Sequence, residues 1–218
     1  MFALKEYCTK LENLQLRNTS ISDAGLVYLS DSSIQLQSLD LSHCDNISSY
    51  GFQKLLASSC MKSLIELDVF SVDLSLQEIP KHCKFLEVLS CGARDAFDSG
   101  TNSDGDKLSI ALSQNCAELR ELRCICVQSI TAVGLRELGK HCKKVEVLYL
   151  DRCCKTAISL PFPKLVELNI RGDNKSVANQ ITDDVLVDIS EHCTLLTDID
   201  ISFNELITDE GIHFMTKR

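Results

Sequence analysis

The chain has 218 residues, of which 44% are apolar and 24% are charged, and its formal net charge is −9. These proportions are ordinary for a folded globular protein and exclude a disordered chain. The acidic balance argues against a surface for nucleic acid or for an anionic membrane, because both need clusters of Lys and Arg. It favours a protein partner that presents a basic patch.

The chain contains twelve cysteines, which raises the possibility of a disulfide-bonded extracellular scaffold. Such scaffolds are short and poor in aliphatic residues, whereas this chain is rich in Leu and Ile. The N-terminus lacks the charged and apolar regions of a signal peptide, and no apolar run reaches the roughly 18 residues of a membrane span. We therefore expect reduced cysteines and a cytoplasmic or nuclear protein that does not bind membranes.

One pattern repeats along the whole chain. Aligned on a leading cysteine, it reads C-x-x-L-x-x-L-x-L-x-x-C/N-x-x-I-[ST]-D-x-G-L-x-x-L. This predicts a single domain over residues 1–218 with about eight units. From the N-terminus, the units begin at Cys8, Ser33, Cys60, Cys83, Cys116, Cys142, Phe162 and Cys193.

Each unit predicts a strand, a turn and a helix. The L-x-x-L-x-L segment alternates as a short strand does. Asp23, Asp183 and Asp209 suit the positive end of a helix dipole. A Ser or Thr follows Ile where a helix would begin, at positions 22, 48, 131, 182 and 208.

Two units are short and two are long. In units three and six, Pro80, Pro161 and Pro163 limit helix length, so we expect a turn or 3₁₀ segment instead of a full helix. Units four and seven carry irregular insertions at 92–107 and 171–180, both between the strand and the helix. Insertions on one rim of a repeat protein can belong to its binding surface, or they can simply be tolerated there.

Three His-Cys pairs end consecutive predicted helices and could be metal ligands, redox centres or copies of one structural position: His82-Cys83, His141-Cys142 and His192-Cys193. We favour the structural interpretation, in which Cys faces the stack and His faces solvent. Cys124 and Cys153 occupy repeat positions, which leaves only Cys126 and Cys154 unassigned and too few thiols for a zinc site. No nucleophile has an evident base beside it, so we expect no metal, no cofactor and no enzymatic activity.

The cysteine, L-x-x-L-x-L and I-[ST]-D-x-G-[LI] positions resemble the cysteine-containing leucine-rich repeats of F-box/leucine-rich-repeat proteins over essentially the whole chain. The resemblance implies an α/β fold, a right-handed and curved leucine-rich-repeat solenoid whose parallel strands line the concave face. It also implies the substrate-recognition repeats of an SCF-type E3 ubiquitin ligase.

Only residues 1–7 precede Cys8, which is too few for an F-box, so we expect a fragment or an uncapped array. A Skp-type adaptor is expected as a partner only if an F-box lies outside this chain. The alternative is an F-box-independent scaffold or regulator with no ubiquitin role.

The residues between the leucines of each strand are expected to point to the concave face. In the middle units they form an apolar patch with a polar rim, which is typical of protein-binding sites, with Tyr, Phe and Arg as anchors. The alternative is that they only cover a parallel sheet. The predicted protein-binding residues are Asp68, Phe70, Val88, Glu121, Arg123, Ile125, Val147, Tyr149, Asp151 and Arg171.

Overall fold

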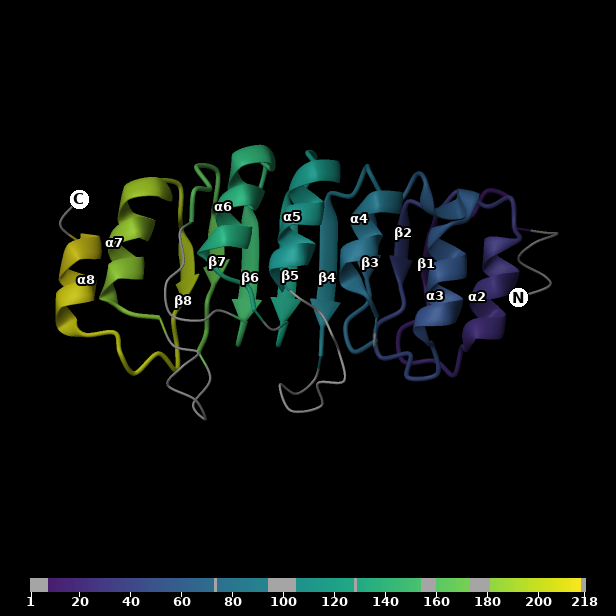
Figure 1. Ribbon diagram of the computed structural model, residues 1–218, viewed down its shortest axis with the longest axis horizontal. Helices are drawn as coiled ribbons and strands as arrows, with labels where there is room; N and C mark the ends of the chain where they lie inside the picture. The colour runs from purple at the N-terminus through teal and green to yellow at the C-terminus, as the bar shows by residue number, and fades with distance from the viewer. Residues whose placement is uncertain are drawn as a thin grey trace.

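The computed structural model is an α/β solenoid with a layer of helices against one sheet (Figure 1). It describes residues 8–72, 74–93, 105–127, 129–153, 160–172 and 181–216. The sheet has eight parallel strands that follow one another in chain order, from β1 to β8. The predicted leucine-rich-repeat solenoid and its eight units are confirmed.

Each strand contributes the central part of one L-x-x-L-x-L segment. The strands are β1 (Asn13–Gln15), β2 (Ser38–Asp40), β3 (Glu66–Asp68), β4 (Val88–Gly92), β5 (Glu121–Ile125), β6 (Val147–Asp151), β7 (Glu167–Asn169) and β8 (Asp198–Asp200). Their register aligns one apolar residue from every unit: Leu14, Leu39, Leu67, Leu89, Leu122, Leu148, Leu168 and Ile199. Aligned apolar residues let each unit cover the apolar layer of the one before it.

The helices lie on one side of the sheet, and α2, α3, α6, α7 and α8 begin where the Ile-Ser/Thr motif predicts. They are α2 (Asp23–Ser30), α3 (Ser49–Leu56), α4 (Ile79–His82), α5 (Gly105–Asn115), α6 (Ala132–His141), α7 (Asp183–His192) and α8 (Asp209–Thr216), with 3₁₀ segments η1 (Ser59–Met61) and η2 (Leu76–Glu78). Ser22, Ser48, Thr131 and Thr182 are the N-caps of α2, α3, α6 and α7. None of the helices in the described parts of the chain has the length and apolarity needed to cross a membrane.

Unit three has a shortened helical segment, as predicted. The 3₁₀ segment η2 and the single turn of α4 stand where other units have a longer helix, and Pro80 lies in the first turn of α4. A proline is tolerated there because the first amides of a helix have no partner within it. In unit six, residues 160–166 form no helix, and 154–159 lie outside the described residues.

The predicted insertion at 92–107 is too wide at both ends. Gly92 is the last residue of β4, and residues 105–107 form the first turn of α5. The Gly-Asp composition of this turn is typical of a loop. Asp106 nevertheless belongs to the start of the helix, where it accepts a hydrogen bond from the backbone nitrogen of Thr131 in the next unit. The interior of this stretch, 94–104, and most of the second one, 173–180, lie outside the described residues. β4 ends at Gly92 and β7 at Asn169, so both stretches come at or directly after the ends of parallel strands.

A carboxylate at the start of one helix binds the start of the next helix. Asp183 accepts hydrogen bonds from the backbone nitrogen and the Oγ1 of Thr208, at 2.9 and 2.6 Å. A Cβ at Gly211 would collide with the Asp183 side chain, so this close approach requires glycine. The same two bonds join two other unit pairs, Asp23 with Ser48 and Asp106 with Thr131. The I-[ST]-D-x-G motif therefore links units in addition to starting helices.

We expect Asp183→Ala to destabilise the protein more than Asp209→Ala. Both residues begin a helix after Thr, but only Asp183 is shown accepting bonds from a following unit. The helix-dipole effect is common to both changes, so the difference isolates the link between units. The melting temperature of Asp183→Ala should be lower than that of Asp209→Ala by on the order of 3 °C at neutral pH.

Acid should remove this difference. The hydrogen bonds from Thr208 lower the pKa of the Asp183 carboxyl from its ordinary value of 3.8. A carboxyl with a lowered pKa contributes its stabilisation above the unfolded value and loses it as the pH falls through the folded value. The gap between the two variants should therefore shrink below pH 3.8. Equal melting at neutral pH, or a gap that persists in acid, would contradict the assigned link.

Candidate functional site

The leading cysteines form a row of buried hydrogen-bond donors along the ends of the helices. The Cys142 thiol donates to the carbonyl of Cys116, and the Cys116 thiol donates to the carbonyl of Cys83, both at 3.3 Å. The Cys193 thiol continues the row to the carbonyl of Leu160, at 3.4 Å. Cys83, Cys142 and Cys193 are the C-caps of their helices, and the three preceding histidines are exposed. The prediction that the His-Cys pairs are copies of one structural position is confirmed.

These thiols are held in the protonated form. Burial raises the pKa of Cys83 and Cys116 to about 12 and that of Cys142 and Cys193 to about 11. Metals and electrophiles react with the thiolate, which is scarce at such pKa values. Within the described residues, no three His, Cys, Asp or Glu side chains are grouped so that they could hold a metal ion.

A second row of donors between units occupies the Cys/Asn position that follows β2, β6 and β8. The thiol of Cys44 donates to the carbonyl of Leu16 at 3.1 Å, and that of Cys153 donates to the carbonyl of Cys124 at 3.2 Å. In the last unit, Asn204 Nδ2 donates to the carbonyl of Ile170 at 3.0 Å. The polar atoms of these residues form hydrogen bonds to the preceding unit, so these residues serve the structure of the solenoid.

The alternate residues of the strands form the other side of the sheet, which we call the open face. In β4, β5 and β6 the first, third and fifth residues are half-buried, whereas the second and fourth are buried in the core. Eight predicted residues belong to this face: Asp68, Val88, Glu121, Arg123, Ile125, Val147, Tyr149 and Asp151. Phe70 and Arg171 lie two residues after the last residues of β3 and β7. Their role in binding stays a prediction.

The sheet register arranges the open face in rows that mix apolar and charged residues. One row runs through Val88, Glu121, Val147 and Glu167. Glu121 lies between the two valines, so these apolar residues alternate with carboxylates and do not adjoin. The next row contains Asp68, Ser90, Arg123, Tyr149 and Asn169, and a third contains Gly92, Ile125 and Asp151.

Four side chains at the middle of the open face hold one another in place, and we call them the Arg123 cluster: Glu121, Arg123, Tyr149 and Glu167. The Arg123 guanidinium lies over the Tyr149 ring, 4.4 Å from its centroid, and Arg123 Nε donates to Glu121. The Tyr149 hydroxyl donates to Glu167, and this bond together with burial raises the pKa of Tyr149. The bond to Glu121 raises the pKa of Arg123, so the guanidinium stays charged.

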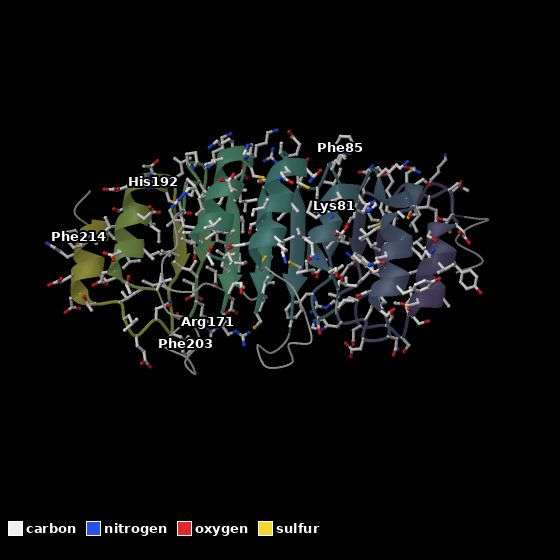
Figure 2. The ribbon with its side chains drawn as sticks, viewed as in Figure 1. Lys81, Phe85, Arg171, His192, Phe203 and Phe214 are labelled. Carbon is white, nitrogen blue, oxygen red and sulfur yellow. The ribbon has the colours of Figure 1, made fainter. Side chains whose placement is uncertain are left out.

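Glu167 was not among the predicted residues, although the sequence contains a signal for it. It precedes Leu168 as Val147 precedes Leu148, so an alignment of the units puts the two in one row. The second missed residue is Phe203, whose ring lies 4.3 Å from the Arg171 guanidinium, and Figure 2 shows the pair at the lower edge of the molecule. Phe203 is outside the L-x-x-L-x-L segment, so strand alternation could not indicate it.

The charged residues of the open face are mostly acidic. Burial, followed by the repulsion of Asp40, raises the pKa of Asp68. Part of this acidity is structural, since Asp40, Asp68 and Asp200 accept the backbone N–H two residues further on. The acids are Asp40, Glu66, Asp68, Glu121, Asp151, Glu167, Asp198 and Asp200, and the bases are Arg17, Arg123 and Arg171.

We expect the cysteines at helix ends to resist modification in the native protein. In iodoacetamide labelling with peptide mapping, Cys83, Cys116, Cys142 and Cys193 should stay unmodified until urea is added, because they are buried and protonated. Exposed Cys8 serves as the internal control and should react in the native state. A chelator should leave the melting temperature unchanged. Loss of stability on chelation would instead assign a metal to these thiols.

Adjacent residues of β6 should respond very differently to truncation. Leu148 is fully buried, so Leu148→Ala should cost about 2–5 kcal/mol of unfolding free energy. Tyr149→Ala removes only the ring on which Arg123 stacks and the hydrogen bond to Glu167, both at a half-exposed site. This should cost roughly 1 kcal/mol of unfolding free energy. Urea denaturation measures both. Similar costs would place Tyr149 in the core and remove it from the open face.

Comparison with known proteins finds similarity to leucine-rich-repeat proteins. A family model described as leucine-rich repeat matches residues 7–30, 33–56 and 192–213. F-box/LRR-repeat protein 4 of Bos taurus is 26% identical over 184 residues, which cover 81% of this chain and 28% of that protein. The chain therefore spans less than a third of the length of this relative.

Among solved structures, a chain from the crystal structure of the Rad7 and Elc1 complex in yeast matches at 15% identity and a TM-score of 0.39. The match covers 94% of this chain and 73% of that one. The repeat pattern, the parallel solenoid and the family-model matches together identify the chain as a leucine-rich-repeat solenoid, and over most of its length it is similar to a protein named as an F-box/LRR-repeat protein.

Proposed function

We propose that the chain is a protein-interaction module that holds its partner on the open face, as the substrate-recognition repeats of an SCF-type E3 ubiquitin ligase. The observation that carries the proposal is the Arg123 cluster at the centre of this face. The chain supplies binding and orientation, and other subunits supply the ubiquitin-transfer chemistry.

The Arg123 cluster has the properties of a binding anchor. Arg and Tyr are enriched among the residues that dominate protein interfaces. The stacking of Arg123 on Tyr149 and the bond from Tyr149 to Glu167 fix these side chains before a partner arrives. Side chains that are already ordered lose less entropy on binding, so more of the contact energy appears as affinity.

The charge of the open face favours a partner with a basic segment. Carboxylates from six of the eight strands outnumber the arginines on it, and complementary charge speeds association and excludes wrong partners. Phe70, packed edge-on against His43 with ring centroids 5.2 Å apart, and the Arg171–Phe203 pair extend the surface on either side of the Arg123 cluster.

The ubiquitin-ligase role is supported by similarity to a protein named as an F-box/LRR-repeat protein. A Skp-type adaptor would bind through an F-box outside this chain. A scaffold or regulator without a ubiquitin role is the second candidate, because the leucine-rich repeats alone fit either function.

The test is capture of partners by the wild type and by Arg123→Ala/Tyr149→Ala, quantified by mass spectrometry. The chain offers a matched control on the helix side, Tyr50→Ala/Lys54→Ala, which removes a Lys stacked on a Tyr at 5.6 Å. A partner of the open face should be captured at least about tenfold less by the first variant, since anchor residues contribute 2 kcal/mol or more, and equally by the control.

Two outcomes decide between the candidate functions. A captured partner whose ubiquitination and turnover fall when the protein is removed from cells would support the ligase role. A partner whose turnover does not change would support the scaffold role instead. If both double variants retain every partner, the open face is not the binding surface.

A further inference from the structure

A second surface lies at the opposite edge of the solenoid from Arg171 and Phe203. Its centre is Phe85, in the turn between α4 and β4, which is 63% exposed. Figure 2 shows Phe85 at the upper edge of the molecule and the Arg171–Phe203 pair at the lower edge. A single exposed phenyl ring is ordinary on a protein surface, so the residues around it decide whether it has a binding role.

A cavity of about 340 Å³ lies beside the Phe85 ring, and its lining is cationic. Lys62, Lys81, His82 and Lys84 line it together with the apolar Leu56 and Ala57, and no Asp or Glu is among its lining residues. A second cavity of about 700 Å³ shares Phe85 and Lys62 and continues toward Ile65; unlike the first, it has carboxylates in its lining, Glu87 and Glu118, which are paired with Arg120 and Lys144. In a chain with a net charge of −9, a cavity without a carboxylate concentrates positive charge where the rest of the molecule repels anions.

Two of these lysines have no carboxylate of their own. The third lysine of the cavity, Lys81, is paired with Glu78 at 2.7 Å. Lys140, which lies outside the cavity, forms the same kind of pair with Glu137 at 2.6 Å. Lys62 and Lys84, by contrast, form no ion pair with any residue of the described parts of the chain. Their charges therefore remain available beside an exposed ring.

We propose that this edge is a docking site for an acidic peptide segment of a second protein. An apolar side chain of the segment packs against Phe85, and carboxylates on either side of it bind Lys62 and Lys84. The cavity volume is at the lower end of the range for ligand sites, which suits one large side chain better than a folded domain. The ligand of this site is acidic, whereas the partner proposed for the open face is basic, and the two sites use different residues. The proposal therefore does not depend on the proposed function.

The test measures fluorescence anisotropy of a fluorescein-labelled peptide in which one leucine is flanked on both sides by glutamates. Wild-type protein should bind it saturably, and a peptide with glutamines in place of the glutamates should not bind. Lys62→Glu/Lys84→Glu should weaken binding by about tenfold or more, because it removes two attractions and adds two repulsions. Phe85→Ser should weaken it by about threefold to tenfold with an unchanged melting temperature, because the ring is exposed.

The control variant is Lys10→Glu/Lys164→Glu, which makes the same change of net charge at two exposed lysines outside both cavities. It should bind the acidic peptide as the wild type does, and so should Arg123→Ala/Tyr149→Ala. Equal loss in the control, equal binding of the glutamine peptide, or no binding by the wild type would overturn the proposal. Self-association of the wild type that Lys62→Glu/Lys84→Glu abolishes, without peptide binding, would overturn it in favour of a second copy of the chain.

Discussion

Each unit of this solenoid needs partners that only a neighbouring unit can supply. The apolar residue at the centre of each strand is covered by the aligned residues on either side, and a buried Leu contributes about 1.5–3 kcal/mol only when it is covered in this way. Burial also deprives backbone carbonyls of water, so each unit must give hydrogen bonds to the one before it. The thiols of Cys116 and Cys142 do this in one row and those of Cys44 and Cys153 in another. A cysteine is suited to both tasks, because it is small and apolar and still carries a weak donor.

The same constraint decides what the open face can present. With the inner positions of β5 and β6 committed to Leu122, Cys124, Leu148 and Leu150, only the alternate residues can vary without loss of core packing. The register then determines which of them meet, and it brings Arg123 beside Tyr149 and Tyr149 level with Asn169. At Gly92 the backbone has a positive φ, and a Cβ would collide with the backbone of Ile125, so the third row has no side chain at that point. Rigid backbone and fixed register together explain how a surface of half-exposed side chains can be ordered without a partner.

The sequence predicted the features that depend on local periodicity and left out those that depend on how units meet. Helix starts at Ser48 and Thr131 and the buried caps Cys83 and Cys142 follow from residue type and spacing within one unit. The carboxylate link was missed because it joins Asp183 to a residue of the following unit, and a helix-dipole role was sufficient to explain the aspartate. Strand alternation placed the predicted residues on one face, but it could not show that Glu121 separates Val88 from Val147. That fact requires the register of three strands. Sequence reasoning could not find the cavity at Phe85 for the same reason, since the end of α3, Lys62 after η1, α4 and the following turn all contribute to it.

The distribution of charge gives the solenoid two surfaces of opposite sign. The open face carries its carboxylates along the strands, whereas Lys62 and Lys84 lie at the edge where strands begin and helices end. At physiological ionic strength the field of an exposed charge decays over about 8 Å, so a partner is attracted chiefly by the charges next to its own contact. A repeat array has contacts only between adjacent units, so it can hold two partners of different charge while each unit keeps its own core.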